Sequence, residues 1–391
     1  MSVRTDLTIK KPVSPKIGTL GIALLAAGIV LAAVAYMTDP RHAAVNNVVA
    51  FLFLVSLGVG GTFLVALEYL TGAVWSVPMR RVNEFLGGAV VLALLAGIPL
   101  LFRLHDLFEW THEAAVAADA MLSAKTPYLN VEFFLLRFGL FFLLWLLFTW
   151  LLTRNSLRQD VTRDQSLTRS NVRWAAVFMP VFALTITFTA IDWAMSLQPH
   201  WYSTMFGVYY FSGTVLAALG VTTFAVVSMV ESGHLPPLGR DHYYNLGALL
   251  FVFTNFWAYI AFSQFMLIWY ANLPEETFWF MTRWEGGWKW VAIALILARF
   301  AVPYFVLLPQ NAKMDPRRLK IMGLWIAAAH LLDLYWLTTP AVHGVTGGWP
   351  ELAFLLLVAG AVILLFRYKM ARHNLVPVGD PKLERGLEFH L

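Results

Sequence analysis

Residues 321–337 read IMGLWIAAAHLLDLYWL. The stretch is apolar enough to lie in a bilayer, yet it carries His330 and Asp333 one helical turn apart. Ionisable side chains at that depth are costly, so they usually face the interior of a helix bundle or a water-filled path. Two interpretations remain open at this point: a pair that only holds helices together, and a pair that serves function.

Comparable apolar stretches recur along nearly the whole chain of 391 residues. The composition is 59% hydrophobic and 13% charged, which excludes a string of soluble domains. A transmembrane barrel would show short alternating segments instead of long apolar runs. The sequence therefore predicts an all-α polytopic membrane protein. Because the chain has no cysteine, it cannot hold a thiolate redox centre or a cysteine-ligated iron–sulfur cluster.

Ten spans can be drawn, and the first is predicted to be retained as a helix, since no cleavage site follows it. They cover residues 17–37, 46–75, 83–103, 132–153, 171–197, 202–231, 243–272, 288–309, 319–340 and 350–370. Lys and Arg outside the spans lie mostly on the side of the N-terminus. The other side holds only Arg41, Arg103, Lys125, Arg283 and Lys289. This asymmetry predicts cytoplasmic termini, and explains the basic charge without nucleic acid as a partner.

A parallel internal repeat is indicated by matches that recur four spans apart. Arg137-Phe138 in span four corresponds to Arg299-Phe300 in span eight, and Asp192 in span five corresponds to Asp333 in span nine. Spans 2–5 and 6–9 are thus predicted to form two similar four-helix bundles, with spans 1 and 10 peripheral. The corresponding segments are residues 1–45, 46–197, 198–340 and 341–391.

Each bundle therefore has one Arg within a span, and one Asp on the next span, at depths that allow the two to pair. His330 is the feature that distinguishes the second bundle, because Thr189 stands at the equivalent place in the first. Glu68 in span two has no obvious cation near it in the sequence. An unpaired carboxyl in apolar surroundings can exchange protons near neutral pH.

Integral haem with two axial histidines is excluded, because His330 is the only histidine placed deep in a span. No metal cluster, P-loop or dinucleotide-binding motif is found, so no cofactor is expected to be bound by this chain except a quinone. Proton transfer is the chemistry that the deep polar residues allow. Span seven adds a polar stripe, which serves either proton transfer or packing between helices. The stripe consists of Asn255, Tyr259, Ser263 and Gln264.

Residues 236–276, PPLGRDHYYNLGALLFVFTNFWAYIAFSQFMLIWYANLPEE, resemble the membrane subunits of bacterial alternative complex III. They are most similar to the smaller of its two subunits related to the polysulfide reductase membrane anchor (NrfD/PsrC-like). The layout of ten spans in two bundles also looks like that superfamily. The resemblance implies a subunit of a quinol:electron-acceptor oxidoreductase in the bacterial inner membrane.

The resemblance also implies partner subunits and a role in proton conduction or quinol binding. Haem c and iron–sulfur clusters are then expected on other subunits, beside the larger NrfD-like subunit, with a terminal oxidase downstream of cytochrome c or a similar carrier. Proton conduction or a quinol site is proposed for such subunits. The matching charged residues here are Glu68, Arg137, Asp192, Arg299, His330 and Asp333.

Two other functions remain open from the sequence. A purely structural anchor for peripheral redox subunits would use the same polar residues for packing. A secondary transporter would also have repeats and polar residues near the midplane, although transporters often have inverted repeats and broken helices at the site.

Overall fold

The computed structural model describes residue 7 and residues 12–342 and 348–391, and all secondary structure in these ranges is helical. The chain is an all-α polytopic membrane protein, as predicted. Ten helices within the described ranges are long and apolar enough to cross a membrane. Six are continuous: α1 (Pro15–Thr38), α2 (Pro40–Thr71), α8 (Val131–Thr162), α10 (Phe206–Glu231), α11 (Arg240–Ala271) and α16 (Trp349–Arg372). A seventh span consists of α15 (Pro316–Thr338), which continues into the short turn Thr339–Ala341.

The other three spans are composed of shorter elements. One contains α3 (Arg80–Gly87) and α4 (Ala89–Leu101), and one contains α9 (Ser166–Trp193) with the short turn Met195–Leu197. The third runs from α13 (Trp288–Ile296) through a π-helical turn (Leu297–Ala301) to α14 (Val302–Leu307).

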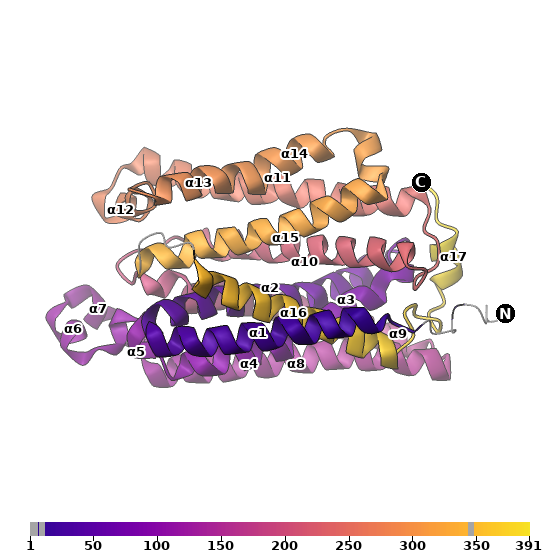
Figure 1. Cartoon of the computed structure of the whole chain (residues 1–391), viewed down its shortest axis with the longest axis horizontal. Helices are drawn as coiled ribbons and strands as arrows, with labels where there is room; N and C mark the ends of the chain where they lie inside the picture. Colours follow the sequence, from indigo (N-terminus) through magenta and orange to yellow (C-terminus); the bar gives the residue numbers. More distant parts are fainter. Residues whose placement is uncertain (1–6, 8–11, 343–347) are drawn as a thin grey trace.

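Helices α2 and α10 pack against each other at the centre of the molecule (Figure 1). The most apolar part of α2 is buried completely, because α4 and α9 cover its other sides. Helix α10 is covered in turn by α11 and α15. The contact between α2 and α10 therefore joins the two predicted bundles, and side chains on it can link one bundle to the other.

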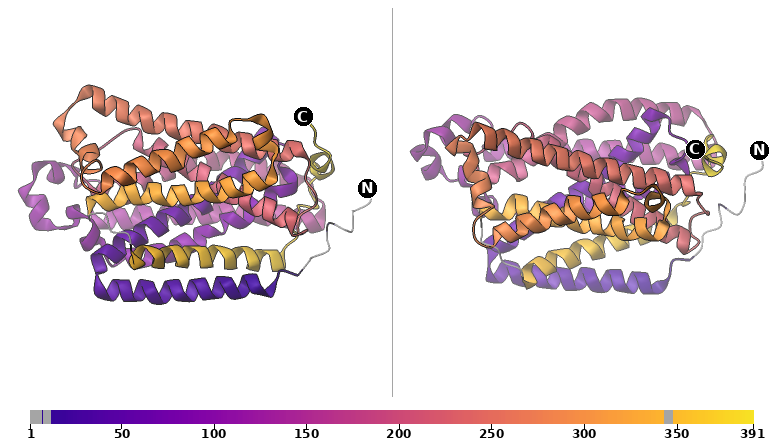
Figure 2. Two further views of the ribbon diagram at one scale, coloured as in Figure 1. Left: turned by 45° about the horizontal axis from the view of Figure 1, so that its top comes forward. Right: turned by 90° about the horizontal axis from the view of Figure 1, so that it is seen from above.

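Helices α1 and α16 lie side by side along the edge of the molecule, as both views in Figure 2 show. Gly28 makes this pairing close, since a Cβ there would lie 2.4 Å from the backbone nitrogen of Leu357. Small residues permit such backbone approach between membrane helices. The prediction that spans one and ten are peripheral is confirmed.

Helix α15, which carries the stretch quoted at the outset, has a well-defined start. Asp315 caps it by accepting a 3.0 Å hydrogen bond from the backbone nitrogen of Arg317, and Pro316 occupies the first helical position. From this start, successive turns place Ile326, His330 and Asp333 on the buried side of the helix. The cap therefore fixes where the helix begins, and packing against α10 and α2 buries the face that carries both ionisable side chains.

The π-helical turn in the eighth span directs a cation into the interior. Arg299 lies in this turn and is fully buried. A π-turn inserts one extra residue into a helix, and such turns occur frequently at functional sites. The corresponding residue of the first bundle, Arg137, lies in the uninterrupted helix α8 instead.

The start of α1 and the C-terminal end of the chain lie at the same end of the helix bundle (Figure 1). The opposite end carries α5 (Leu104–Leu107), α6 (Glu113–Ala118), α7 (Ala120–Lys125) and α12 (Pro274–Thr282). The start of the predicted segment 1–45 and residues 343–347 of the segment 341–391 lie outside the described residues.

The residues after α16 form a folded cap on the bundle, which includes α17 (Leu383–Leu387). Val376, Asp380 and Leu383 are buried there. The sequence did not predict this docking, because the polar composition of the tail is typical of an extended surface segment.

Candidate functional site

Three ionisable side chains meet between the π-helical turn and α15. Arg299 Nη2 lies 3.0 Å from His330 Nδ1 and 3.6 Å from Asp333 Oδ2. All three side chains are buried, with at most 1% of each exposed. The sequence predicted that Arg299 and Asp333 can pair, and the structure adds His330 as a third member that contacts the same guanidinium.

Asp333 receives two further donors from neighbouring helices. Trp257 Nε1 of α11 donates to Asp333 Oδ2 at 3.1 Å, and Tyr209 Oη of α10 donates to Asp333 Oδ1. Arg299 also lies over the Trp257 ring, 5.3 Å from its centroid. The Asp333 side chain is therefore held in place from α10, α11 and the π-turn together.

His330 has a defined tautomer in this arrangement. A guanidinium can only donate, so His330 Nδ1 accepts from Arg299 and the ring proton resides on Nε2. His330 Nε2 lies 3.0 Å from Ser56 Oγ and donates to it. Ser56 belongs to α2, so this hydrogen bond connects the second bundle to the first.

Ser56 continues the connection toward α10. Its Oγ lies 3.2 Å from Tyr210 Oη and 3.2 Å from Thr214 Oγ1, and all three side chains are buried. A continuous series of polar groups therefore runs from Asp333 through Arg299, His330 and Ser56 to Tyr210 and Thr214. Each member is within 3.6 Å of the next.

The corresponding pair in the first bundle is a closed salt bridge. Arg137 Nε and Nη2 donate to the two oxygens of Asp192 at 2.8 and 2.9 Å. Tyr128 Oη donates to Asp192 at 2.8 Å, and its ring lies under the guanidinium at 3.9 Å. Thr189, at the place equivalent to His330, donates to the carbonyl of Thr185 in its own helix. The first bundle therefore holds a bidentate pair, which is the strongest form of this contact.

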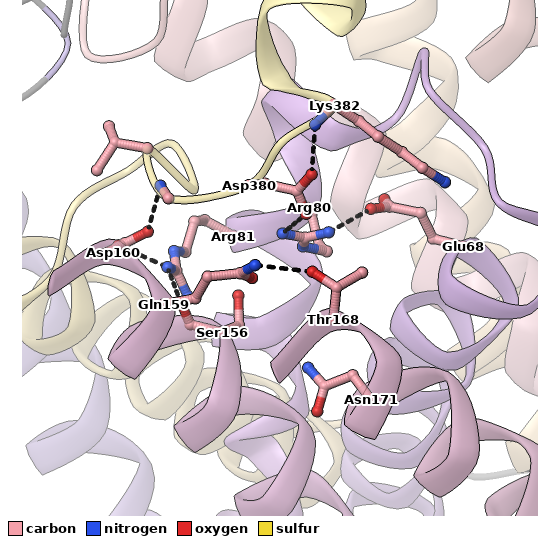
Figure 3. Close-up of polar contacts among 12 residues, drawn as sticks. Glu68, Arg80, Arg81, Ser156, Gln159, Asp160, Thr168, Asn171, Asp380 and Lys382 are labelled. Carbon is pink, nitrogen blue, oxygen red and sulfur yellow. Dashed lines mark hydrogen bonds and ion pairs between the residues drawn. The ribbon is translucent and has the colours of Figure 1, made fainter. Parts of the chain in front are cut away.

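Glu68 lies apart from both sets, in a buried cluster at the end that carries the chain termini (Figure 3). The expectation of an unpaired carboxyl at Glu68 was wrong, because the fold brings a cation to it. Arg80 Nη1 donates to Glu68 Oε1 at 3.0 Å, and Arg80 Nη2 donates to Asp380 Oδ2 at 2.7 Å. Glu84 Oε1 lies 3.4 Å from Arg80 Nε. Glu68 is therefore part of a charge network that also holds the C-terminal segment.

Arg81 forms the second half of this network (Figure 3). Its guanidinium donates to Asp160 Oδ2 at 2.6 Å, and to Glu84. Asp160 also accepts a 3.2 Å hydrogen bond from the backbone nitrogen of Gly379. Arg80 and Arg81 lie outside the predicted span 83–103, yet both are buried, with 2% and 0% exposed.

The polar stripe on α11 does not join the buried cluster. Tyr259 is 65% exposed, and Asn255 donates to a carbonyl of its own helix. Ser263 is half-buried, and Gln264 accepts from a hydroxyl that precedes α10. The residue of α11 that does reach the cluster is Trp257, on another face of the helix. Packing between helices explains this stripe better than proton transfer does.

Five uncharged residues in and around the buried cluster of the second bundle were missed from the sequence, namely Ser56, Tyr209, Tyr210, Thr214 and Trp257. Uncharged polar residues are common in membrane helices and cost little, so no single one stands out. One signal was present: Tyr210 and Thr214 are four residues apart and therefore share a face of α10.

No protein-family model matches the chain, and no curated protein matches it. The geometry of the buried cluster therefore carries the functional proposal.

Proposed function

We propose that the chain is an integral membrane subunit of a quinol:cytochrome c (or equivalent carrier) oxidoreductase complex, and that its second bundle provides a proton half-channel. One observation supports this most strongly: a buried series of polar groups connects Asp333, Arg299 and His330 to α2. Intramembrane ionisable residues that face a bundle interior are typical of proton relays. The resemblance of residues 236–276 to alternative complex III supports the choice of complex.

His330 is the group that passes the proton in this proposal. A proton can bind Nδ1 only after Arg299 turns away, because two cations 3.0 Å apart repel each other strongly in an apolar interior. Asp333 Oδ2, 3.9 Å from Nδ1, then stabilises the imidazolium. The proton on Nε2 leaves to Ser56 Oγ as Ser56 releases its own hydroxyl proton to Thr214 Oγ1, and Thr214 in turn releases its hydroxyl proton to the next acceptor of the half-channel. Movement of Arg299 thus controls the transfer.

The electron carriers belong to partner subunits in this proposal. Haem c and iron–sulfur clusters are held by those partners, quinol is the electron donor, and this chain borders the quinone site or conducts protons beside it. The proposed location is the bacterial inner membrane, with both termini in the cytoplasm. A fluorescent-protein fusion at the C-terminus tests the orientation, since such a fusion matures in the cytoplasm.

Proton movement by the intact complex in membrane vesicles tests the relay. We expect His330→Gln to lower the number of protons moved per quinol oxidised, and Ser56→Ala to act in the same direction. Thr189→Val is the matched control, because the Thr189 hydroxyl donates within α9 and, among the described residues, bonds to no other helix. An assembled complex that moves protons normally with His330→Gln would contradict the relay and leave the structural anchor as the function.

Membership of a redox complex has its own test. Purification in a mild detergent is expected to recover the chain with haem-containing partners. Recovery of a folded chain without them would contradict the proposed complex, and would favour a secondary transporter.

A further inference from the structure

A large groove lies on the face of the first bundle, remote from the relay. It encloses about 1030 Å³ between α3, α4, α8 and α16. Gly87 and Gly88, where α3 meets α4, leave room at its inner side, and Leu143, Leu147 and Trp150 of α8 line its length. These three side chains of α8 are 42–63% exposed, so the groove opens toward the lipid-facing surface.

The length of the apolar part of the groove matches one leaflet of a bilayer. The lining on α8 extends from Leu143 to Thr162, which at the rise of an α-helix is ~28 Å, and the part from Leu143 to Thr153, before the first cation, is ~15 Å. The hydrocarbon core of a bilayer is about 30 Å thick, so one leaflet contributes about 15 Å of it. The groove therefore runs from near the midplane to the headgroup region, at the end of the bundle that holds the chain termini.

Cations gather at the headgroup end of the groove. Arg154 and Arg158 of α8 and Lys369 of α16 line it there. Arg154 also lies over the Trp150 ring, 4.7 Å from its centroid. The carboxylate in the lining, Glu84, is bound to Arg81 on the inner side. The exposed end of the groove is therefore positive, while the rest is apolar.

We propose that this groove binds an anionic phospholipid of the leaflet next to the chain termini. The phosphate groups contact Arg154, Arg158 and Lys369, and an acyl chain lies along Leu147 and Leu143. Basic pockets between membrane helices near the headgroup level are typical of sites for cardiolipin and other anionic lipids. A free phosphate ion matches only the charged end, whereas a lipid matches both the charge and the apolar length.

Lipid titration of the purified full-length chain, followed by native mass spectrometry, tests the site. The probes are cardiolipin, phosphatidylglycerol and phosphatidylcholine. We expect the two anionic lipids to bind at least tenfold more tightly than phosphatidylcholine. Arg154→Gln with Arg158→Gln is expected to weaken anionic lipid binding by roughly fivefold for each cation removed. Leu147→Trp, which fills the apolar part, is expected to weaken binding of every lipid.

The matched control carries Arg169→Gln and Arg173→Gln, two exposed cations near the same end of the bundle but outside the groove. This control is expected to bind lipids as the unaltered chain does. Equal loss in the control, or equal affinity for phosphatidylcholine, would overturn the proposal. Full competition by inorganic phosphate would indicate a free-anion site instead. A photo-crosslinker at position 147 that captures a polypeptide in the membrane would assign the groove to a partner helix.

Discussion

Arg299 and Asp333 approach each other only to 3.6 Å between Nη2 and Oδ2, beyond hydrogen-bond distance. The guanidinium instead donates to His330 at 3.0 Å, so it is shared between an imidazole and a carboxylate. Arg137 and Asp192, the equivalent pair, form two direct hydrogen bonds. A shared cation can change partners more easily than a bidentate one, which is why the relay is proposed for the second bundle.

The closed pair of the first bundle is expected to be structural. Asp192→Ala leaves the Arg137 charge buried without its partner, and is expected to lower the free energy of unfolding by about 3–5 kcal/mol. Replacing both residues, as Arg137→Met with Asp192→Leu, is expected to recover most of that loss, because two apolar side chains need no compensation. Denaturation of each purified variant in detergent measures its free energy of unfolding. A single variant as stable as the unaltered chain would show that the pair does not hold the bundle.

Gly213 leaves space for the shared cation. A Cβ at Gly213 would lie 2.9 Å from His330 Cε1 and 3.0 Å from Arg299 Nη2. Gly213→Ala is therefore expected to displace both side chains, to cost about 1–3 kcal/mol by overpacking, and to lower proton movement. Gly139→Ala is the matched control, since a Cβ there meets nothing within 4 Å and alanine favours the helix by about 1 kcal/mol. The melting temperature is expected to be highest for Gly139→Ala, intermediate for the unaltered chain and lowest for Gly213→Ala. Equal proton movement by the two variants would refute the prediction.

The docked C-terminal segment depends on one close backbone approach. A Cβ at Gly379 would lie 2.0 Å from the carbonyl oxygen of Gln159. Gly379→Ala is therefore expected to separate the segment from α8 and to break the contact between Arg80 and Asp380. Hydrogen exchange of residues 380–388 is expected to become at least tenfold faster, while that of α2 changes little. Unchanged exchange would show that other contacts hold the segment.

Helix α7 is expected to loosen in acid. Asp119 accepts from His200 at 2.6 Å, and from the backbone nitrogens of Leu122 and Met121. These hydrogen bonds, that of His200 first, hold the pKa of Asp119 below its usual value. Because the pKa of Asp119 is lower in the folded state, ionised Asp119 stabilises the helix at every pH above its unfolded pKa of about 3.9. This contribution to stability is lost as the pH falls through the lower pKa of the folded state.

Hydrogen exchange of the α7 amides, corrected for intrinsic rates, is therefore expected to accelerate below about pH 4. Asp119→Asn removes the titrating group but keeps an acceptor for the cap, so its exchange is expected to lose this acid dependence. If both proteins respond to acid alike, another group controls the helix end.

The spans, and the positions of Arg137, Asp192, Arg299 and Asp333 within them, followed from the sequence for a simple reason. Apolar length determines which segments cross a bilayer. Because a buried charge is costly, each ionisable residue within such a segment stands out in the sequence. The surroundings of Arg80 and Arg81 did not follow in this way. A cation at the end of a span is usually solvated, and only the fold brings acids to these two arginines from α2, α8 and the C-terminal segment.

Apolar length and the cost of buried charge thus determined that this chain is a helical membrane protein with His330 and Asp333 facing inward. The packing of α2 against α10 and α15 decided what those residues touch, and placed Ser56 beside His330 across 274 positions of sequence. The docking of the C-terminal segment likewise supplied Asp380 to Arg80. Periodicity reports which face of a helix is buried. The partner on that face depends on how helices cross, and that is determined by close packing among segments far apart in the chain.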